Sequence, residues 1–220
     1  MSTPFDQSTY QVRLEWGVEG LARLAPADVV IVVDVLRFSS TLVGAVEAAP
    51  VTLEVARAWS INGAAVADAA ASDSGVVVLA GALRNATAVA EAVLRVQDER
   101  QQRTSVTVIA AGERTPEGAL RFAVEDQLGV GAVIAALSDV GIDHSSPEAV
   151  SAAESFRALR RAVRHLLSAS GSGRELGERD PVEGQLAASG IVPVTVREAA
   201  AIDDSTVVPV LRDGAFVPFG

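Results

Sequence analysis

The sequence predicts an α/β fold, a three-layer α/β/α sandwich around a mostly parallel or mixed sheet. Short Val- and Ile-rich runs alternate with Ala-rich helical stretches, which is typical of parallel strands joined by crossover helices. The 220 residues are 49% hydrophobic, enough for a large core, and we expect one domain over residues 1–220. Asp213-Gly214 between two apolar runs predicts a C-terminal hairpin, which requires at least one antiparallel pairing.

Apolar periodicity places the strands. Alternation of apolar and polar residues over 10–16 predicts a strand at a sheet edge. The run VVIVVD at 29–34 is apolar until Asp34 and predicts a buried parallel strand. Three further strands are predicted over 51–56, 76–81 and 105–112.

Helical patterns occupy most of the intervals between the strands. Ser39-Ser40-Thr41 supplies N-cap candidates for the helix that follows the first core strand. A flexible loop is predicted for SASGSGR at 168–174. Further helices are predicted over 62–71, 85–96, 123–137 and from Pro147 to about residue 168.

Composition excludes several classes of function. A net charge of −10 and a pI near 4.7 argue against nucleic acid, and no basic run is interleaved with aromatic residues. The absence of cysteine removes thiol nucleophiles, disulfides and zinc–thiolate sites. No signal-peptide core is present, and no run reaches the ~18 apolar residues of a membrane helix. We therefore expect a cytoplasmic protein with neither nucleic acid nor membrane as partner.

Polar residues follow several predicted strands at the point where each strand ends. Asp34 and Arg37 follow the first core strand, and ligands of open α/β sheets bind outside the carboxyl ends of the strands. We expect these polar groups to converge, although each also has a structural interpretation as an ion pair, cap, turn or solvated loop. The other candidates are Asn62-Gly63, Arg84-Asn85-Ala86-Thr87 and Gly112-Glu113-Arg114.

Two adjacent carboxylates open the helix predicted over 123–137. Glu125 and Asp126 lie in its first turn, where the helix dipole by itself favours acidic residues. Alternatively, one of them binds a metal or acts as general acid/base. Because neighbouring helical residues point about 100° apart, we expect only one of the two to face the site.

Several segments, in this order, are similar to those of one known family. VDVLRFSST at 33–41 matches the family signature V-D-V-L-R-x-[ST]-[ST]-T. INGAAVADAAA, AGALRNATAVAEAV, IAAGER and RFAVEDQLGVGAVI resemble further family segments, as do GRELGERD at 173–180 and the VVPVLRDG tail. The chain thus resembles the Mg-dependent 2-phosphosulfolactate phosphatases. It differs in a shorter interval between residue 49 and Asn62, and in Ala64, where the family has a hydroxyl residue.

This resemblance implies Mg²⁺-dependent hydrolysis of a phosphate monoester on a 2-hydroxy carboxylic acid, such as 2-phosphosulfolactate. It implies that Asp34 is the Mg²⁺ ligand or the nucleophile, and that Asp126 or Glu125 is a second ligand or the general acid/base. Asp34 and Asp126 are the implied metal ligands. The implied partner is a small anionic phosphorylated carboxylic acid. The implied substrate-binding residues are Arg37, Ser39, Ser40, Thr41, Asn62, Gly63, Asn85, Gly112 and Arg114.

Two alternatives belong to other classes of function. One is a non-catalytic phosphate- or carboxylate-binding member of the same family that has lost part of the active site, in keeping with the shorter interval before Asn62. The other is a structural role, in which the apolar helices bury the interface of a homodimer. Turnover distinguishes the enzyme from both, and metal-dependent ligand protection distinguishes the binder from the structural protein.

Overall fold

A seven-stranded mixed sheet forms the centre of the computed structural model, which describes residues 3–178 and 189–220. The strand order is β1-β5-β2-β4-β8-β9-β3. Four strands are parallel, namely β1 (Val12–Trp16) at the edge, β5 (Val106–Ala110), β2 (Val29–Val33) and β4 (Val77–Gly81). All five residues of β2 are buried, as the unbroken apolar run predicts. The predicted α/β fold with a mixed sheet is confirmed.

The C-terminal hairpin is antiparallel, as predicted. It consists of β8 (Pro209–Arg212) and β9 (Ala215–Pro218), and β9 also pairs with β3 (Val51–Thr52). Asp213 and Gly214 form its turn with φ of 50° and 78°, the left-handed values that Asp and Gly tolerate best. Pro209 is accommodated because β8 meets β4 through one ladder pair, Leu79 with Val210.

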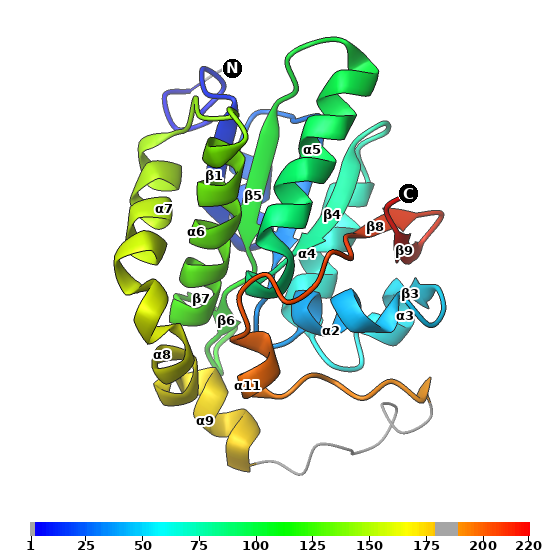
Figure 1. Ribbon diagram of the computed structural model, residues 1–220, viewed down its shortest axis with the longest axis vertical. Coiled ribbons are helices and arrows are strands. Elements are labelled where there is room, and N and C mark those ends of the chain that lie inside the picture. The colour runs from blue at the N-terminus through cyan, green and yellow to red at the C-terminus, as the bar shows by residue number, and fades with distance from the viewer. Residues whose placement is uncertain (1–2, 179–188) are drawn as a thin grey trace.

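Helices cover both faces of the sheet, which confirms the predicted three-layer sandwich (Figure 1). On one face, α5 (Ala86–Arg100) and α6 (Val124–Asp139) pack on the strands, and α7 (Pro147–Leu159) packs on α6. On the other face lie α1 (Gly17–Arg23), α2 (Phe38–Ala45) and α4 (Ile61–Ala71). Alternate residues of β2 belong to the two cores, with Ile31 on the first face and Val32 on the second.

Two predicted segments differ from the structure because side-chain caps start helices there. The strand expected over 51–56 is confirmed only at β3, because Thr52 Oγ1 accepts a hydrogen bond from the Val55 amide at 3.2 Å and begins α3 (Leu53–Ala56). Residues 168–174 were expected to be a loop. Instead, Ser170 Oγ accepts from the Gly173 amide at 3.0 Å at the start of α9 (Gly171–Glu178). Arg179 and Asp180, the end of the GRELGERD segment, lie outside the described residues.

The long helix predicted from Pro147 is present, with an interruption. After α7, a 3-10 turn, η2 (Arg160–Ala162), leads into α8 (Val163–Ala169). None of the helices within 3–178 and 189–220 is long and apolar enough to cross a membrane.

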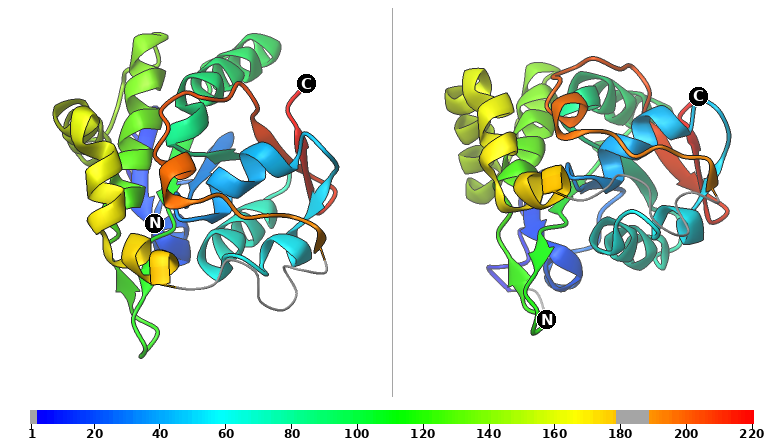
Figure 2. Two further views of the ribbon diagram at one scale, coloured as in Figure 1. Left: turned by 60° about the horizontal axis from the view of Figure 1, so that its bottom comes forward. Right: turned by 90° about the horizontal axis from the view of Figure 1, so that it is seen from below.

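The carboxyl ends of the parallel strands form one edge of the molecule, at the bottom of Figure 1. A small hairpin of β6 (Glu113–Arg114) and β7 (Leu120–Arg121) lies at this edge, together with α9 and α11 (Val196–Ala199). Figure 2 shows the same edge from below, with α9 and α11 across the strand ends. Residues that follow these strands and were expected to converge, such as Asp34 after β2 and Gly112 after β5, lie at this edge.

Candidate active site

Asp34, directly after β2, is held by donors from two helices. Its Oδ1 accepts from the Phe38 amide at 3.1 Å, and its Oδ2 accepts from the Ser60 hydroxyl and from the Gly63 amide, the latter at 3.1 Å. Only 4% of the residue is exposed. Burial raises the pKa of Asp34 to about 6 against the opposing effect of these hydrogen bonds, and the nearby charge of Glu113 also raises it.

Asp126, in the first turn of α6, joins the ends of two strands. Its Oδ1 accepts from the Val35 amide and its Oδ2 from the Gly112 amide, both at 2.8 Å. The residue is 3% exposed. Burial raises the pKa of Asp126 well above its usual range, and the charges of Asp34 and Glu125 raise it further. The two aspartates therefore belong to one electrostatic site, in which the charge of Asp34 disfavours the ionisation of Asp126.

Glu125 points to a different part of the same region. It is 3% exposed and lines a recess of about 200 Å³ together with Arg121, Ser170 and Ser172. In the described part of the chain, no donor makes a hydrogen bond to its carboxylate. This geometry agrees with the expectation that Glu125 and Asp126 point in different directions, since Asp126 binds backbone amides while Glu125 faces the recess.

Ser60 is a site residue that the sequence analysis did not select, and Glu113 was named there only as one of the polar residues that follow a strand. Glu113 Oε1 accepts from Asn62 Nδ2 at 3.1 Å and from the Arg114 amide at 2.8 Å. It lines both the recess at Glu125 and a larger one of about 460 Å³ beside Ser60 and Asn62. Ser60 is the N-cap of α4, and the pattern Ser-x-x-Gly was the available signal. Glu113 had no sequence signal beyond its place after a strand.

The hydroxyl groups of Ser39 and Thr41 bind other parts of the chain. Because α2 starts at Phe38, Ser39, Ser40 and Thr41 lie inside this helix, and the prediction that they form its N-cap is wrong. Instead, the Asp34 carboxylate accepts a hydrogen bond from the Phe38 amide, and the Asp34 carbonyl accepts one from the Ser39 amide. Ser39 Oγ donates to the Val32 carbonyl at 2.9 Å and accepts from the Asp34 amide. Thr41 Oγ1 accepts from the Val194 amide at 3.3 Å. Ser40 Oγ is buried and forms no hydrogen bond within the described residues.

Asn85 is likewise engaged in structure. It occupies the N-cap position of α5, but its side chain does not cap the helix. Its Oδ1 accepts from the Ala82 amide at 2.8 Å, and its Nδ2 donates to the carbonyls of Ala80 and Val207. The side chain thereby ties the end of β4 to the segment before β8, which uses its donors and one acceptor site. Arg37 lies half-buried in the turn between β2 and α2.

The two glycines of the predicted site are required by close approach. A Cβ on Gly63 would lie 2.5 Å from Phe38 Cγ, so the α4 backbone and its amide can reach Asp34 only without a side chain. Gly112 has φ of +67°, and a Cβ there would lie 2.8 Å from Leu120 Cδ1. Both residues contribute amide donors to the aspartates.

The Arg114 guanidinium forms an ion pair with Glu19 of α1. Its Nη1 donates to Glu19 Oε1 at 3.1 Å and to the Gly118 carbonyl at 3.0 Å. Arg114 also lines the larger recess, beside Asn62 and Glu113. Across the ranges 3–178 and 189–220, no three His, Cys, Asp or Glu side chains form a group that could hold a metal by themselves.

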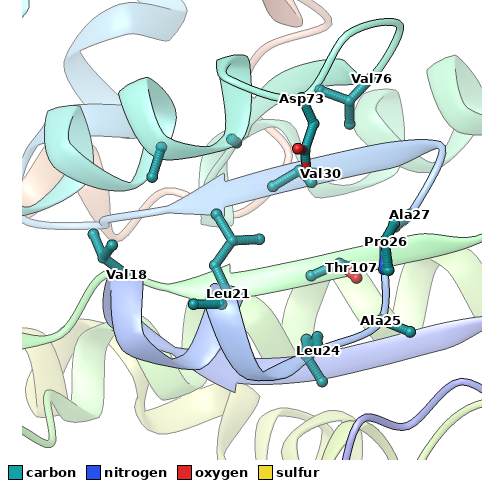
Figure 3. Close-up of a pocket in the computed structure, with 13 residues that line it drawn as sticks. Val18, Leu21, Leu24, Ala25, Pro26, Ala27, Val30, Asp73, Val76 and Thr107 are labelled. Carbon is teal, nitrogen blue, oxygen red and sulfur yellow. The ribbon is translucent and has the colours of Figure 1, made fainter. Parts of the chain in front are cut away.

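A separate apolar cavity of about 400 Å³ lies between α1 and α4 (Figure 3). Ala27 and Val76, which precede β2 and β4, place part of it at the amino ends of the strands. Asp73 is the one charged residue among its described lining residues. Phosphate chemistry needs cations or polar donors, so this cavity is not a candidate for it.

The fold and the site define an α/β protein with four carboxylate groups, Asp34, Glu113, Glu125 and Asp126, at the carboxyl edge of a parallel sheet. The family model for 2-phosphosulpholactate phosphatase matches residues 57–214, and the chain belongs to this family. No curated protein matches the chain. The matched segment includes Glu113, Glu125 and Asp126 and begins after Asp34. The family name implies a phosphatase.

Proposed function

We propose that this chain is a Mg²⁺-dependent phosphatase that hydrolyses the phosphate monoester of a 2-hydroxy carboxylic acid such as 2-phosphosulfolactate. The family match over residues 57–214 carries the proposal. The buried carboxylates beside two recesses support it. Phosphoryl transfer depends mainly on positioning and on neutralising charge, and a metal held by carboxylates supplies both.

Asp34 and Asp126 are the residues that would hold Mg²⁺. Each aspartate oxygen other than Asp34 Oδ2 accepts one hydrogen bond, which leaves a second acceptor position. Mg²⁺ typically binds one or two carboxylates together with substrate phosphates, so a site with fewer than three protein ligands fits it. When bound, Mg²⁺ would offset the negative charge of the phosphate oxygens.

The hydrogen bonds of Asp34 favour its role as a ligand over its role as a nucleophile. Both of its oxygens are fixed by amide or hydroxyl donors from Phe38, Ser60 and Gly63. Only Oδ1 keeps an acceptor position, and an oxygen that binds Mg²⁺ through that position is not free to attack phosphorus. A water molecule is therefore the proposed nucleophile, and Asp34 and Asp126 are the residues that position the metal and the phosphate.

Glu125 is the proposed general acid. Water adds to phosphorus, the bond between phosphorus and the ester oxygen breaks, and the departing oxygen needs a proton to become the hydroxyl of the product. Asp126 uses both oxygens on backbone amides, whereas Glu125 faces the recess with no such bond in the described structure. Glu125 can therefore pass a proton to that oxygen and recover one from the attacking water.

The test is phosphate release from a panel of 2-phospho carboxylic acids, with and without Mg²⁺. We expect Mg²⁺-dependent turnover that Asp34→Asn abolishes while circular dichroism shows a folded protein. Asp139→Asn is the matched control, because Asp139 has a 77% exposed side chain at the far end of α6. If Asp34→Asn retains activity, Asp34 has no role in the mechanism.

The same assay tests the alternative of a non-catalytic binder. Folded wild-type protein that releases no phosphate from any panel member would exclude the phosphatase. If phosphorylated acids then protect that protein against thermal unfolding in the presence of Mg²⁺, the binder is supported.

A further inference from the structure

The recess at Glu125 is lined by a positively charged side chain, Arg121, that the proposed mechanism does not use. Arg121, exposed on β7, lies over the first residue of α9, because a Cβ built on Gly171 would be 3.3 Å from Arg121 Nη2 and 3.6 Å from Nη1. Both residues line the recess. The Arg121 guanidinium makes no ion pair or hydrogen bond with any residue in 3–178 or 189–220. Its charge is therefore available to a ligand.

Gly171 and Ser172, the first two residues of α9, line the same recess. Ser170 Oγ accepts from the Gly173 amide, and the Ser170 carbonyl accepts from the Arg174 amide. The amides of Gly171 and Ser172 donate to no other described residue. The first amides of a helix carry partial positive charge and suit an anion. Together with Arg121, they make one wall of the recess attractive to an oxyanion.

An independent observation indicates that the recess takes a ligand. Glu125 is only 3% exposed and lines this recess, and no described residue donates a hydrogen bond to its carboxylate. Its carboxylate borders the recess, so a group bound there can supply the hydrogen bond that the described chain does not. The ligand must then combine an anionic group, for Arg121, with an ester or hydroxyl oxygen, for Glu125. A hydroxy acid has both.

We propose that Arg121, with the amides of Gly171 and Ser172, binds the carboxylate of the substrate that is not transferred, and that Arg121 determines specificity for phosphorylated acids over simple phosphate esters. This inference rests on the proposed function. The planar guanidinium matches the two oxygens of a carboxylate. On the 2-hydroxy acid, the carboxylate and the ester oxygen sit on the same carbon, so both fit one recess of about 200 Å³.

The experiment compares two substrates that differ only in the carboxylate. In 2-phospholactate the carbon that bears the phosphate carries a carboxylate, and in isopropyl phosphate it carries a methyl group instead. We expect Arg121→Gln to lower kcat/KM for 2-phospholactate about tenfold, the effect of one charge-assisted hydrogen bond. For isopropyl phosphate, kcat/KM should not change. Arg164→Gln, an exposed arginine on α8, is the matched control and should affect neither substrate.

Equal losses on both substrates, or no loss on either, would overturn the proposal, because Arg121 would then contact the phosphate, stabilise the fold or bind nothing. If the wild-type protein hydrolyses neither substrate, the proposed function fails, and calorimetry with lactate in the presence of Mg²⁺ decides about the subsite. Lactate affinity that falls about tenfold in Arg121→Gln supports it. Equal affinity in both proteins, or no binding to either, refutes it.

Discussion

Replacing Gly63 by alanine tests whether the close contact between α4 and α2 builds the site. A Cβ at this position would lie 2.5 Å, 2.6 Å and 2.7 Å from Phe38 Cγ, Cβ and Cδ1. Phe38 is fully buried and packs edge-on against Phe216, with ring centroids 5.7 Å apart, so its ring has little room to move. Carbon atoms in contact are normally about 3.5–4.0 Å apart. The helix must therefore shift by roughly 1 Å.

The magnitude follows from two opposing effects. Overpacking of a core costs about 1–3 kcal/mol. Alanine in place of glycine inside a helix gains about 1 kcal/mol. The net loss of unfolding free energy is thus up to about 2 kcal/mol, or a fall in Tm of up to about 8 °C for a chain of this length. The shift also moves the Gly63 amide away from Asp34, and a misplacement of about 1 Å can lower kcat/KM on the order of 100-fold.

Gly44→Ala provides the matched control for this substitution. Gly44 is also helical, in α2, but a Cβ there would meet no atom within 4 Å. We expect Gly44→Ala to raise the unfolding free energy by about 0.5–1 kcal/mol with unchanged activity. Urea denaturation and phosphate release measure both effects. The reasoning is refuted if Gly63→Ala is as stable and as active as Gly44→Ala.

Three further substitutions test stability alone. Burial raises the pKa of Asp28, but hydrogen bonds from Ser105 and the charge of Arg100 outweigh it, so the pKa is lowered. The ionised carboxylate therefore stabilises the fold at pH values above the unfolded pKa of about 4. Asp28→Asn should lower the unfolding free energy by about 1–2 kcal/mol at pH 7 and by less at acidic pH, as measured by urea denaturation at each pH. A difference that does not change with pH contradicts this reasoning. Thr107→Val should raise stability by about 1 kcal/mol in the same titration, since the buried Thr107 hydroxyl lacks a partner among the described residues; a loss would mean that the hydroxyl is satisfied. Asn85→Ala should lower stability by about 2–4 kcal/mol, because three backbone groups lose their partner, and an unchanged Tm would show that these bonds contribute nothing.

The predicted elements were correct where a local pattern decides the structure. The runs at 29–34, 76–81 and 105–112 form the central parallel strands, because a continuous β-branched run has no stable alternative to burial on both faces. Local pattern failed at 53–56 and 168–174, where one hydroxyl cap decides between strand or loop and helix. The caps at Thr52 and Ser170 each need only a single hydrogen bond, which apolar periodicity does not reveal.

The candidate site was predictable in its location and in part of its chemistry. Asp34, Glu125 and Asp126 could be selected because acidic residues after a buried strand, or in the first turn of a helix, are conspicuous in a largely apolar chain. The partners of each group were not predictable. Ser39 and Asn85 were expected to bind phosphate, but their side chains bind the backbone at the end of β2 and in the segment before β8.

The sequence by itself determined the α/β class, the buried strand that ends at Asp34 and the family to which the chain is similar, because these depend on neighbouring residues and on short motifs. The tertiary structure alone decided which groups meet. Ser60 reaches Asp34 across 26 residues, and Asp126 reaches the Val35 amide across 91. Such contacts depend on the order of β5, β2 and β4 in the sheet and on the docking of α4 and α6 upon it. No local pattern carries that information, because the energy that selects the order comes from packing between distant segments.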